Sequence, residues 1–127
     1  MSTLKQKEMQ QGIYVGPSDV RPNRDRKDPA PTGAELITRE RKRQIEKGFT
    51  IEHDSQHSIV EILSAAIAYA MASSRVSKSL DTDDVLASAA GCWPWEPEGF
   101  KPTTPIKDLS KAGALIAAAI DLLQSQQ

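Results

Sequence analysis

Apolar residues recur at helical spacing along most of the chain after residue 31. Residues 59–72 are apolar on nearly every side, and residues 105–124 carry two neighbouring apolar stripes. A helix that is apolar all round lies in the middle of a bundle, and a helix with two stripes packs against two partners. The pattern predicts an all-α fold for residues 32–127, a small bundle of three to four helices with an aromatic, proline-rich loop before the last helix.

Local signals mark the expected helix ends. Thr32-Gly33-Ala34-Glu35 and Ser58-Ile59-Val60-Glu61 have capping-box spacing, in which a hydroxyl and a carboxylate each satisfy a backbone N–H at a helix start. Thr104 before Pro105 marks the start of the last helix. We expect helices at 33–47, 59–72 and 105–124, a shorter one from Asp81 or Thr82, and C-terminal stops at Gly48 and Gly91.

The two stripes of the last helix predict two packing surfaces. One is a heptad-like seam made of Leu109, Gly113, Ile116, Ile120 and Leu123. The adjoining stripe consists of Ala112, Leu115, Ala119 and Leu122. Because a bundle this small can leave one stripe uncovered, we expect a homo-oligomer.

Residues 1–31 have a different composition from the rest. They contain four prolines and a polar run, with Ile13-Tyr14-Val15 as the only apolar island. Such a segment cannot bury enough surface to offset its ordering entropy, so we expect an extended or disordered N-terminal arm. The alternative is that the island docks onto a partner.

Charge and cysteine content narrow the class of protein. Residues 1–30 hold six basic and four acidic side chains, and the remainder ten and thirteen, which disfavours duplex DNA as a partner. The single cysteine, Cys92, excludes an intramolecular disulfide and fits a reducing compartment. Met1–Gln11 lacks a signal-peptide pattern, and the apolar stretches are interrupted short of a membrane span. We expect a cytoplasmic protein without a membrane partner.

The segment 92–102 holds both tryptophans, one of two phenylalanines and three of eight prolines. Trp93 and Trp95, stiffened by prolines, form an expected flat wall with N–H donors, suited to stacking on a base or clamping a peptide. The alternative is that the indoles plug the end of the helical core.

Both histidines lie in the stretch 53–61, with His53 expected in a loop and His57 just before a helix. If that helix began earlier, His53, His57 and Glu61 would line one face and could hold zinc or manganese. The capping box uses Glu61 for the backbone instead, so we assign neither a metal nor a cofactor. Arg39 and Arg43, four residues apart, belong either to a solvated face or to an anion clamp.

Several of these motifs occur in one order along residues 35–123. They are E-R-x-R-Q at 40–44, E-H-D-x-x-H at 52–57, W-P-W at 93–95 and K-A-G-A-L-I at 111–116. In this respect the chain resembles a family of small phage and prophage proteins. The resemblance implies phage origin and a helical fold more than an activity. The chain departs from the family pattern at Phe49, Val60 and Ala119. Ala119 stands where the pattern has a glutamate, and missing carboxylates weaken an enzymatic interpretation.

Three function classes follow. The first is a non-enzymatic phage protein that sequesters a small anionic, nucleotide-type ligand as a counter-defence sponge. The second is an inhibitor that binds a host protein through the aromatic loop and the arm. The third is a metal-dependent enzyme similar to all-α nucleotide pyrophosphohydrolases, with Asp54, Glu61 and Asp108 on magnesium. The candidate ligand-binding residues are Arg39, Arg43, His53, Asp54, His57, Glu61, Trp93, Trp95, Lys101 and Lys111.

Overall fold

A computed structural model describes residues 29–127, and the chain divides into two units at Thr32. The predicted arm, including Ile13-Tyr14-Val15, lies almost entirely outside the described residues. The unit formed by residues 33–127 is all-α, as predicted, and its described residues contain no strand. Its helices are α1 (Gly33–Glu46), α2 (Ile51–Asp54), α3 (Ile59–Ser73), α4 (Thr82–Cys92) and α5 (Pro105–Ser125), with short 3₁₀ turns at Ser74–Val76 and Pro97–Gly99.

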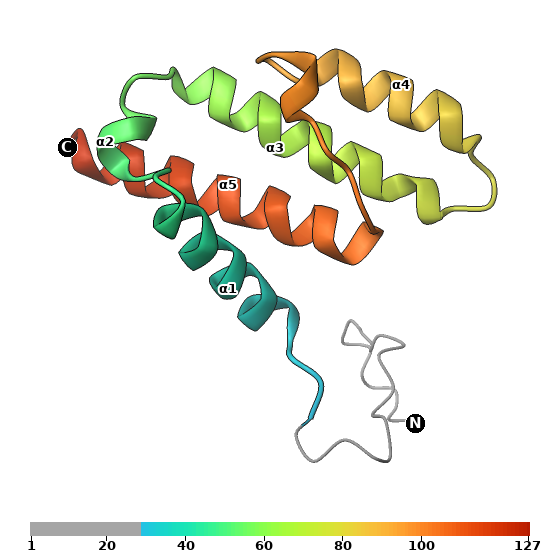
Figure 1. Cartoon of the computed structure of the whole chain (residues 1–127), viewed down its shortest axis with the longest axis horizontal. Helices are drawn as coiled ribbons and strands as arrows, with labels where there is room; N and C mark the ends of the chain where they lie inside the picture. The colour runs from blue at the N-terminus through green and yellow to red at the C-terminus, as the bar shows by residue number, and fades with distance from the viewer. Residues whose placement is uncertain (1–28) are drawn as a thin grey trace. The chain divides into compact units, whose positions relative to one another are not determined.

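The helices of this unit lie side by side in the order α4, α3, α5, α1 (Figure 1). The central pair, α3 and α5, is antiparallel and makes the most extensive contact. The short helix α2 rests against α5, and the segment after α4 crosses back over α3 to reach the start of α5 (Figure 1). As a result, α1 and α3 both pack on α5, one on each side of it.

The capping signals at two helix starts are confirmed. Ser58 Oγ accepts the Glu61 N–H at 3.1 Å, and the Glu61 carboxylate accepts the Ser58 N–H at 3.2 Å. At the start of α5, Thr104 Oγ1 accepts the Lys107 N–H at 3.3 Å, and Pro105 occupies the first turn. These bonds use N–H groups that have no partner inside the helix.

Gly48 ends α1, as predicted. Its φ of 104° is in the left-handed region that glycine adopts without steric cost. The Gly48 N–H donates to Ile45 O and the Phe49 N–H to Gln44 O, both at 3.0 Å, which is the Schellman arrangement. The expectation for Gly91 was wrong: α4 continues to Cys92, and extended backbone at Trp93 ends it.

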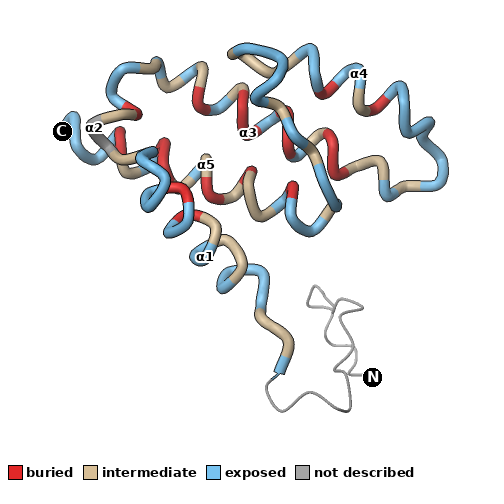
Figure 2. The backbone as a smooth tube through the Cα atoms, viewed as in Figure 1, coloured by how far each residue is buried: buried red, intermediate tan, exposed pale blue. Residues whose placement is uncertain are grey.

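The core lies between α3 and α5, and most of its buried apolar residues are alanines. Ile62, Ala119 and Leu122 form its centre, with Ile59 and Leu115 packed against them. Alanines along both helices are buried where the helices face each other (Figure 2). Small side chains allow two helix backbones to approach closely. Of the two predicted stripes of α5, the one that packs into the core is therefore Ala112, Leu115, Ala119 and Leu122.

The heptad-like seam of α5 behaves differently. Leu109, Ile116, Ile120 and Leu123 are each about half exposed. Gly113 meets another helix, because a Cβ added there would lie 2.5 Å from Ile37 Cδ1 of α1. The glycine thus lets α1 approach α5, while about half of the surface of each large member of the seam stays exposed.

A buried ion pair fixes the start of α5 against the end of α3. Asp108 has no exposed surface, and its Oδ2 lies 2.8 Å from Arg75 Nη1. The other Asp108 oxygen accepts the Thr103 N–H at 2.9 Å, while Arg75 Nη2 donates to Thr103 O at 2.7 Å. These bonds anchor the end of the segment that carries the tryptophans.

The expectation that no stretch is long enough for a membrane span was wrong by length and composition. Ile59–Val76 has a mean hydropathy of 1.4 over 18 residues, enough for a candidate span. In the structure this stretch is mostly α3, packed between α4 and α5. Its apolar character on most sides matches that central position.

Candidate functional site

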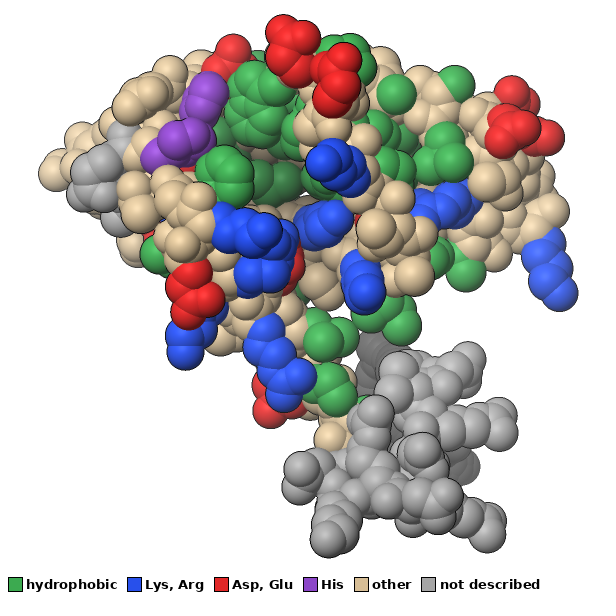
Figure 3. Space-filling view, in the orientation of Figure 1, with side chains coloured by type: hydrophobic (Ala, Val, Ile, Leu, Met, Phe, Trp, Pro, Cys, Tyr) green, Lys and Arg blue, Asp and Glu red, His purple; other side chains and the backbone are tan. Residues whose placement is uncertain are grey.

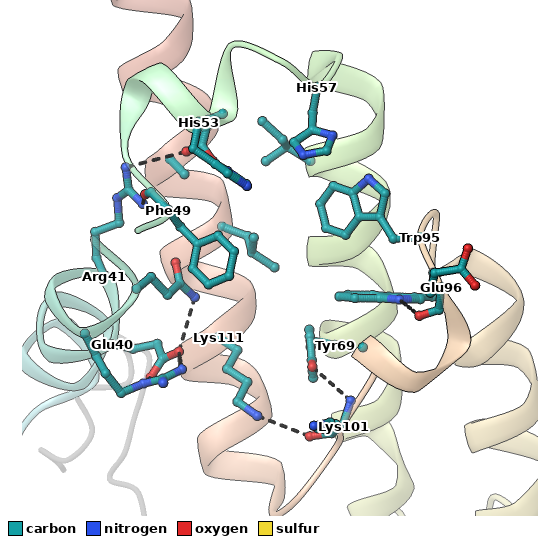
Figure 4. Close-up of a pocket in the computed structure, with 18 residues that line it drawn as sticks. Glu40, Arg41, Phe49, His53, His57, Tyr69, Trp95, Glu96, Lys101 and Lys111 are labelled. Carbon is teal, nitrogen blue, oxygen red and sulfur yellow. Dashed lines mark hydrogen bonds and ion pairs between the residues drawn. The ribbon is translucent and has the colours of Figure 1, made fainter. Parts of the chain in front are cut away.

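A cavity of about 730 Å³ opens over α5, between α1 on one side and α3 with the aromatic segment on the other (Figure 4). Basic side chains gather on the visible face around this hollow, and the two histidines lie at its α2 end (Figure 3). Eight of the ten candidate residues line the cavity. They are Arg43, His53, Asp54, His57, Trp93, Trp95, Lys101 and Lys111.

Aromatic rings form a continuous row along the cavity (Figure 4). Neighbouring ring centroids are 5.0 to 5.5 Å apart. In order, the rings are Phe49, His53, His57, Trp95, Trp93 and Tyr69. Phe100 packs behind the last two, with its centroid 5.0 Å from Tyr69 and 5.4 Å from Trp93. The sequence is poor in aromatic residues, and all of its described Trp, Tyr and Phe side chains lie in this row or pack behind it.

The two tryptophans do not form the flat wall that was expected, because their rings meet edge to face at 89°. Trp93 Nε1 donates to Glu96 O at 2.9 Å, which closes the turn of the aromatic segment. Trp95 Nε1 is buried and has no hydrogen-bond partner within the described residues. A buried N–H without an acceptor costs free energy, and a ligand acceptor reaches this donor only when the Trp95 ring turns.

Two lysines lie at the other end of the row. Lys111 Nζ donates to Lys101 O at 3.1 Å and sits 5.1 Å from the centre of the Tyr69 ring. The Lys101 N–H donates to Tyr69 Oη at 3.0 Å. Burial raises the pKa of Tyr69, although this hydrogen bond opposes the change. No carboxylate of the described chain lies within ion-pair distance of either ammonium, although Lys111 is near enough to Glu40 for its charge to help lower the Glu40 pKa.

Arg43 is partly occupied by its own helix. Its Nε and Nη2 donate to the two oxygens of Glu40 at 2.8 and 2.6 Å, and Gln44 Nε2 donates to Glu40 at 3.2 Å. Burial raises the pKa of Glu40, but the bonds and charge of Arg43 outweigh burial and lower it. The bond to Glu40 likewise raises the pKa of Arg43. Both N–H groups of Nη1 and the second N–H of Nη2 are left for a ligand.

Arg41 is buried below the histidine end of the cavity and ties three helices together. It donates to Phe49 O at 3.2 Å and to Asp121 Oδ2 at 3.5 Å, and lies 3.8 Å from Asp54 Oδ2. Asp54 also lies 3.3 Å from His53 Nδ1. Asp54 therefore serves mainly to hold α2, although it also lines the cavity.

The remaining two candidates lie outside the cavity lining. Arg39 is exposed on α1, so it does not form a clamp with Arg43 inside the cavity. Glu61 caps α3 and lies 3.4 Å from His57 Nδ1. The earlier helix start that would align both histidines with Glu61 does not occur, since α3 begins at Ile59, and His53 belongs to α2 rather than a loop.

Metal ligation finds no support in the geometry. Among the described side chains, which leave out Glu52, no group of three or more His, Cys, Asp or Glu residues is placed to hold a metal ion. The three acids considered for magnesium are engaged separately: Asp54 with Arg41, Glu61 with the start of α3, and Asp108 with Arg75.

Several lining residues were not anticipated from the sequence. The most important are Glu40, Gln44, Phe49 and Tyr69. Tyr69 is the one aromatic residue in the otherwise aliphatic α3, which is a signal that a hydroxyl at that position needs a partner.

Comparisons with known proteins add no identification. The chain matches no protein-family model, and neither a curated protein nor a solved structure shows significant similarity to it. The cavity is therefore the feature of the protein from which its function is inferred.

Proposed function

We propose that this protein captures a small anionic ligand of the nucleotide type in the cavity and holds it without chemical change. The observation that carries the proposal is a row of aromatic rings that ends at Lys101 and Lys111, two cations without a carboxylate partner among the described residues. A nucleotide has the same order of parts, a planar base followed by an anionic phosphate.

The size and polarity of the cavity support this ligand class. Its volume of about 730 Å³ falls within the range of small-molecule sites. Stacking of a base on an aromatic side chain contributes roughly 1–3 kcal/mol. The lysines supply charge-assisted bonds to the phosphate, and a turn of the Trp95 ring would bring its unpartnered N–H to an acceptor on the base.

Capture is favoured over chemical conversion of the ligand because the acidic side chains that an enzyme would use already bind other groups of the fold. Asp54, Glu61 and Asp108 are each held by a separate arginine or helix end, so they cannot together position a metal ion and a water molecule. Capture is also favoured over inhibition of a host protein, because the indoles line a concave cavity rather than a convex surface.

The biological role that we propose rests on the resemblance to small phage proteins. In that role the protein acts in the host cytoplasm as a counter-defence sponge, lowering the free concentration of a nucleotide signal. A sponge needs tight binding and no turnover, and both can be measured on the purified protein.

The experiment is a fluorescence titration with AMP, a cyclic dinucleotide and ADP-ribose, each compared with uncharged adenosine. Both tryptophans line the cavity, so binding changes intrinsic fluorescence without a label. We expect saturable binding of at least one anionic compound, weaker binding of adenosine, and recovery of the intact ligand by chromatography. Conversion of the ligand would establish an enzyme instead, and the absence of any saturable change would refute capture.

Lysine variants test where the anionic group binds. Lys111→Gln removes one cation at the end of the row, and we expect an affinity loss of about tenfold, consistent with a charge-assisted bond. Lys107→Gln is the matched control, because Lys107 is an exposed lysine of the same helix that does not line the cavity. Equal effects of the two variants would argue for general charge attraction rather than a site.

A further inference from the structure

A second surface of the folded unit is apolar and is left exposed by the described helices. Six aliphatic side chains on the two central helices are 39 to 52% exposed. They are Leu63 and Ile67 on α3, and Leu109, Ile116, Ile120 and Leu123 on α5. We name this surface the aliphatic face.

Helix geometry places the six residues on one side of the unit, away from the cavity. On α5, Lys111, Leu115 and Ala118 line the cavity, and the seam residues lie on the other side of the buried stripe. On α3, Ile62 and Tyr69 line the cavity, and Leu63 and Ile67 lie beyond the side that meets α5. Because α3 and α5 are antiparallel neighbours, these outer sides lie next to each other.

We propose that the aliphatic face is the interface of a symmetric homodimer. None of its six members is charged, so the face carries no charge that would attract a partner of opposite charge. The large α5 members keep the heptad-like spacing that packs against a second helix of the same spacing, although Gly113 of the same seam is already covered by Ile37 of α1. A second copy offers that spacing, and a two-fold axis brings identical surfaces together.

The area of the face agrees with this occupant. Six half-exposed aliphatic side chains leave on the order of 500 Å² uncovered, most of the about 800 Å² per partner that a stable interface buries. Val60, 70% exposed at the start of α3, and the small residues around the face enlarge it. The two cavities of such a dimer open on its outer sides, so each subunit binds ligand independently.

The first test is the mass of the purified full-length chain in solution, measured by light scattering across a micromolar concentration series. We expect a value close to twice the 13.9 kDa of one chain. A monomer throughout the series overturns the proposal, as does a larger assembly whose mass is unchanged by substitutions in the face.

Substitutions then locate the interface. Ile120→Glu should halve the mass while helical circular dichroism and tryptophan fluorescence stay unchanged. Val76→Glu is the matched control, because Val76 is 71% exposed in the turn after α3, outside the face. A folded Ile120→Glu protein that remains dimeric overturns the assignment.

A cross-linking experiment covers the case in which the charged variant fails to fold. In a Cys92→Ser background, Ile120→Cys is a mild change that a short bis-maleimide should link between two copies. Val76→Cys in the same background should remain unlinked. Equal cross-linking of both positions, or of neither, overturns the proposal.

Discussion

Trp93 and Trp95 are two residues apart and have different tasks. The indole N–H of Trp93 is bonded to Glu96 O, and its ring is packed among Tyr69, Phe100 and Gly99. The indole N–H of Trp95 is buried without a partner in the described chain, and its ring lies 5.0 Å from His57. Trp93 therefore belongs to the framework that shapes the cavity wall, whereas the Trp95 ring lines the cavity and its indole N–H has no acceptor among the described residues.

The same division applies to the charged groups. Arg75 and Asp108 satisfy each other in the interior, where removal of either leaves a buried charge. Lys111 is bonded only to a backbone carbonyl and an aromatic face, and keeps its charge available. A substitution in the framework should lower stability first, and a substitution at the open positions should lower binding first.

Asp108→Ala should give the largest effect on stability. It leaves the Arg75 charge buried and the Thr103 N–H without its acceptor, for which we expect a loss of about 3–5 kcal/mol in the free energy of unfolding. Urea denaturation followed by circular dichroism measures it. Asp83→Ala, on the exposed start of α4, should change stability by less than about 1 kcal/mol. Similar losses from both variants would contradict the framework role of Asp108.

Trp93→Ala should also destabilise the fold, by roughly 2–3 kcal/mol, because a partly buried indole and its bond to Glu96 are lost. Trp93→Phe keeps the ring contacts and loses only the hydrogen bond, so we expect about 1 kcal/mol. Thermal unfolding of the three proteins measures the series. An alanine variant as stable as the unsubstituted chain would place Trp93 with the open positions.

Trp95→Ala should act on binding instead. Loss of one stacking partner lowers affinity by about 1–3 kcal/mol, roughly tenfold or more, while the free energy of unfolding changes by less than about 1 kcal/mol. Calorimetric titration of the ligand found in the fluorescence screen measures the first quantity, and urea denaturation the second. Global unfolding of this variant would assign Trp95 to the core after all.

Sequence patterns were enough for three of the helix ends, although not for the end of α4, because those three depend on local chemistry. The Ser58 and Glu61 bonds, the Thr104 cap and the positive φ of Gly48 each involve residues close together in the chain. Long-range placement was not accessible in this way. The burial of Arg41 depends on Asp121, 80 residues further along the chain. The apolar pattern of α5 also contains two stripes of equal regularity, and which one is buried depends on where α1 and α3 pack.

The candidate site shows the same limit. Scarce residue types in unusual segments drew attention to the tryptophans, the histidines and two of the lysines, which the fold brings to one cavity. Phe49 and Tyr69 were not counted among the candidate binding residues, because one apolar residue after a helix, or within one, looks like core. The pairing of Arg43 with Glu40, rather than with Arg39 as a clamp, depends on rotamers that spacing alone does not fix.

Tyr69 gives the smallest expected effect and tests the boundary between framework and cavity. Burial raises its pKa above the ordinary value of about 10, so the folded state favours the neutral phenol. This contribution to stability is complete below about pH 10 and is lost as the pH rises through the folded-state pKa, because the unfolded chain releases the proton first. Phenolate absorbance of the native protein, minus that of Tyr69→Phe, should show a midpoint above that of an exposed tyrosine. A normal midpoint would mean that the phenol already reaches water through the cavity, and that Tyr69 belongs with the open positions.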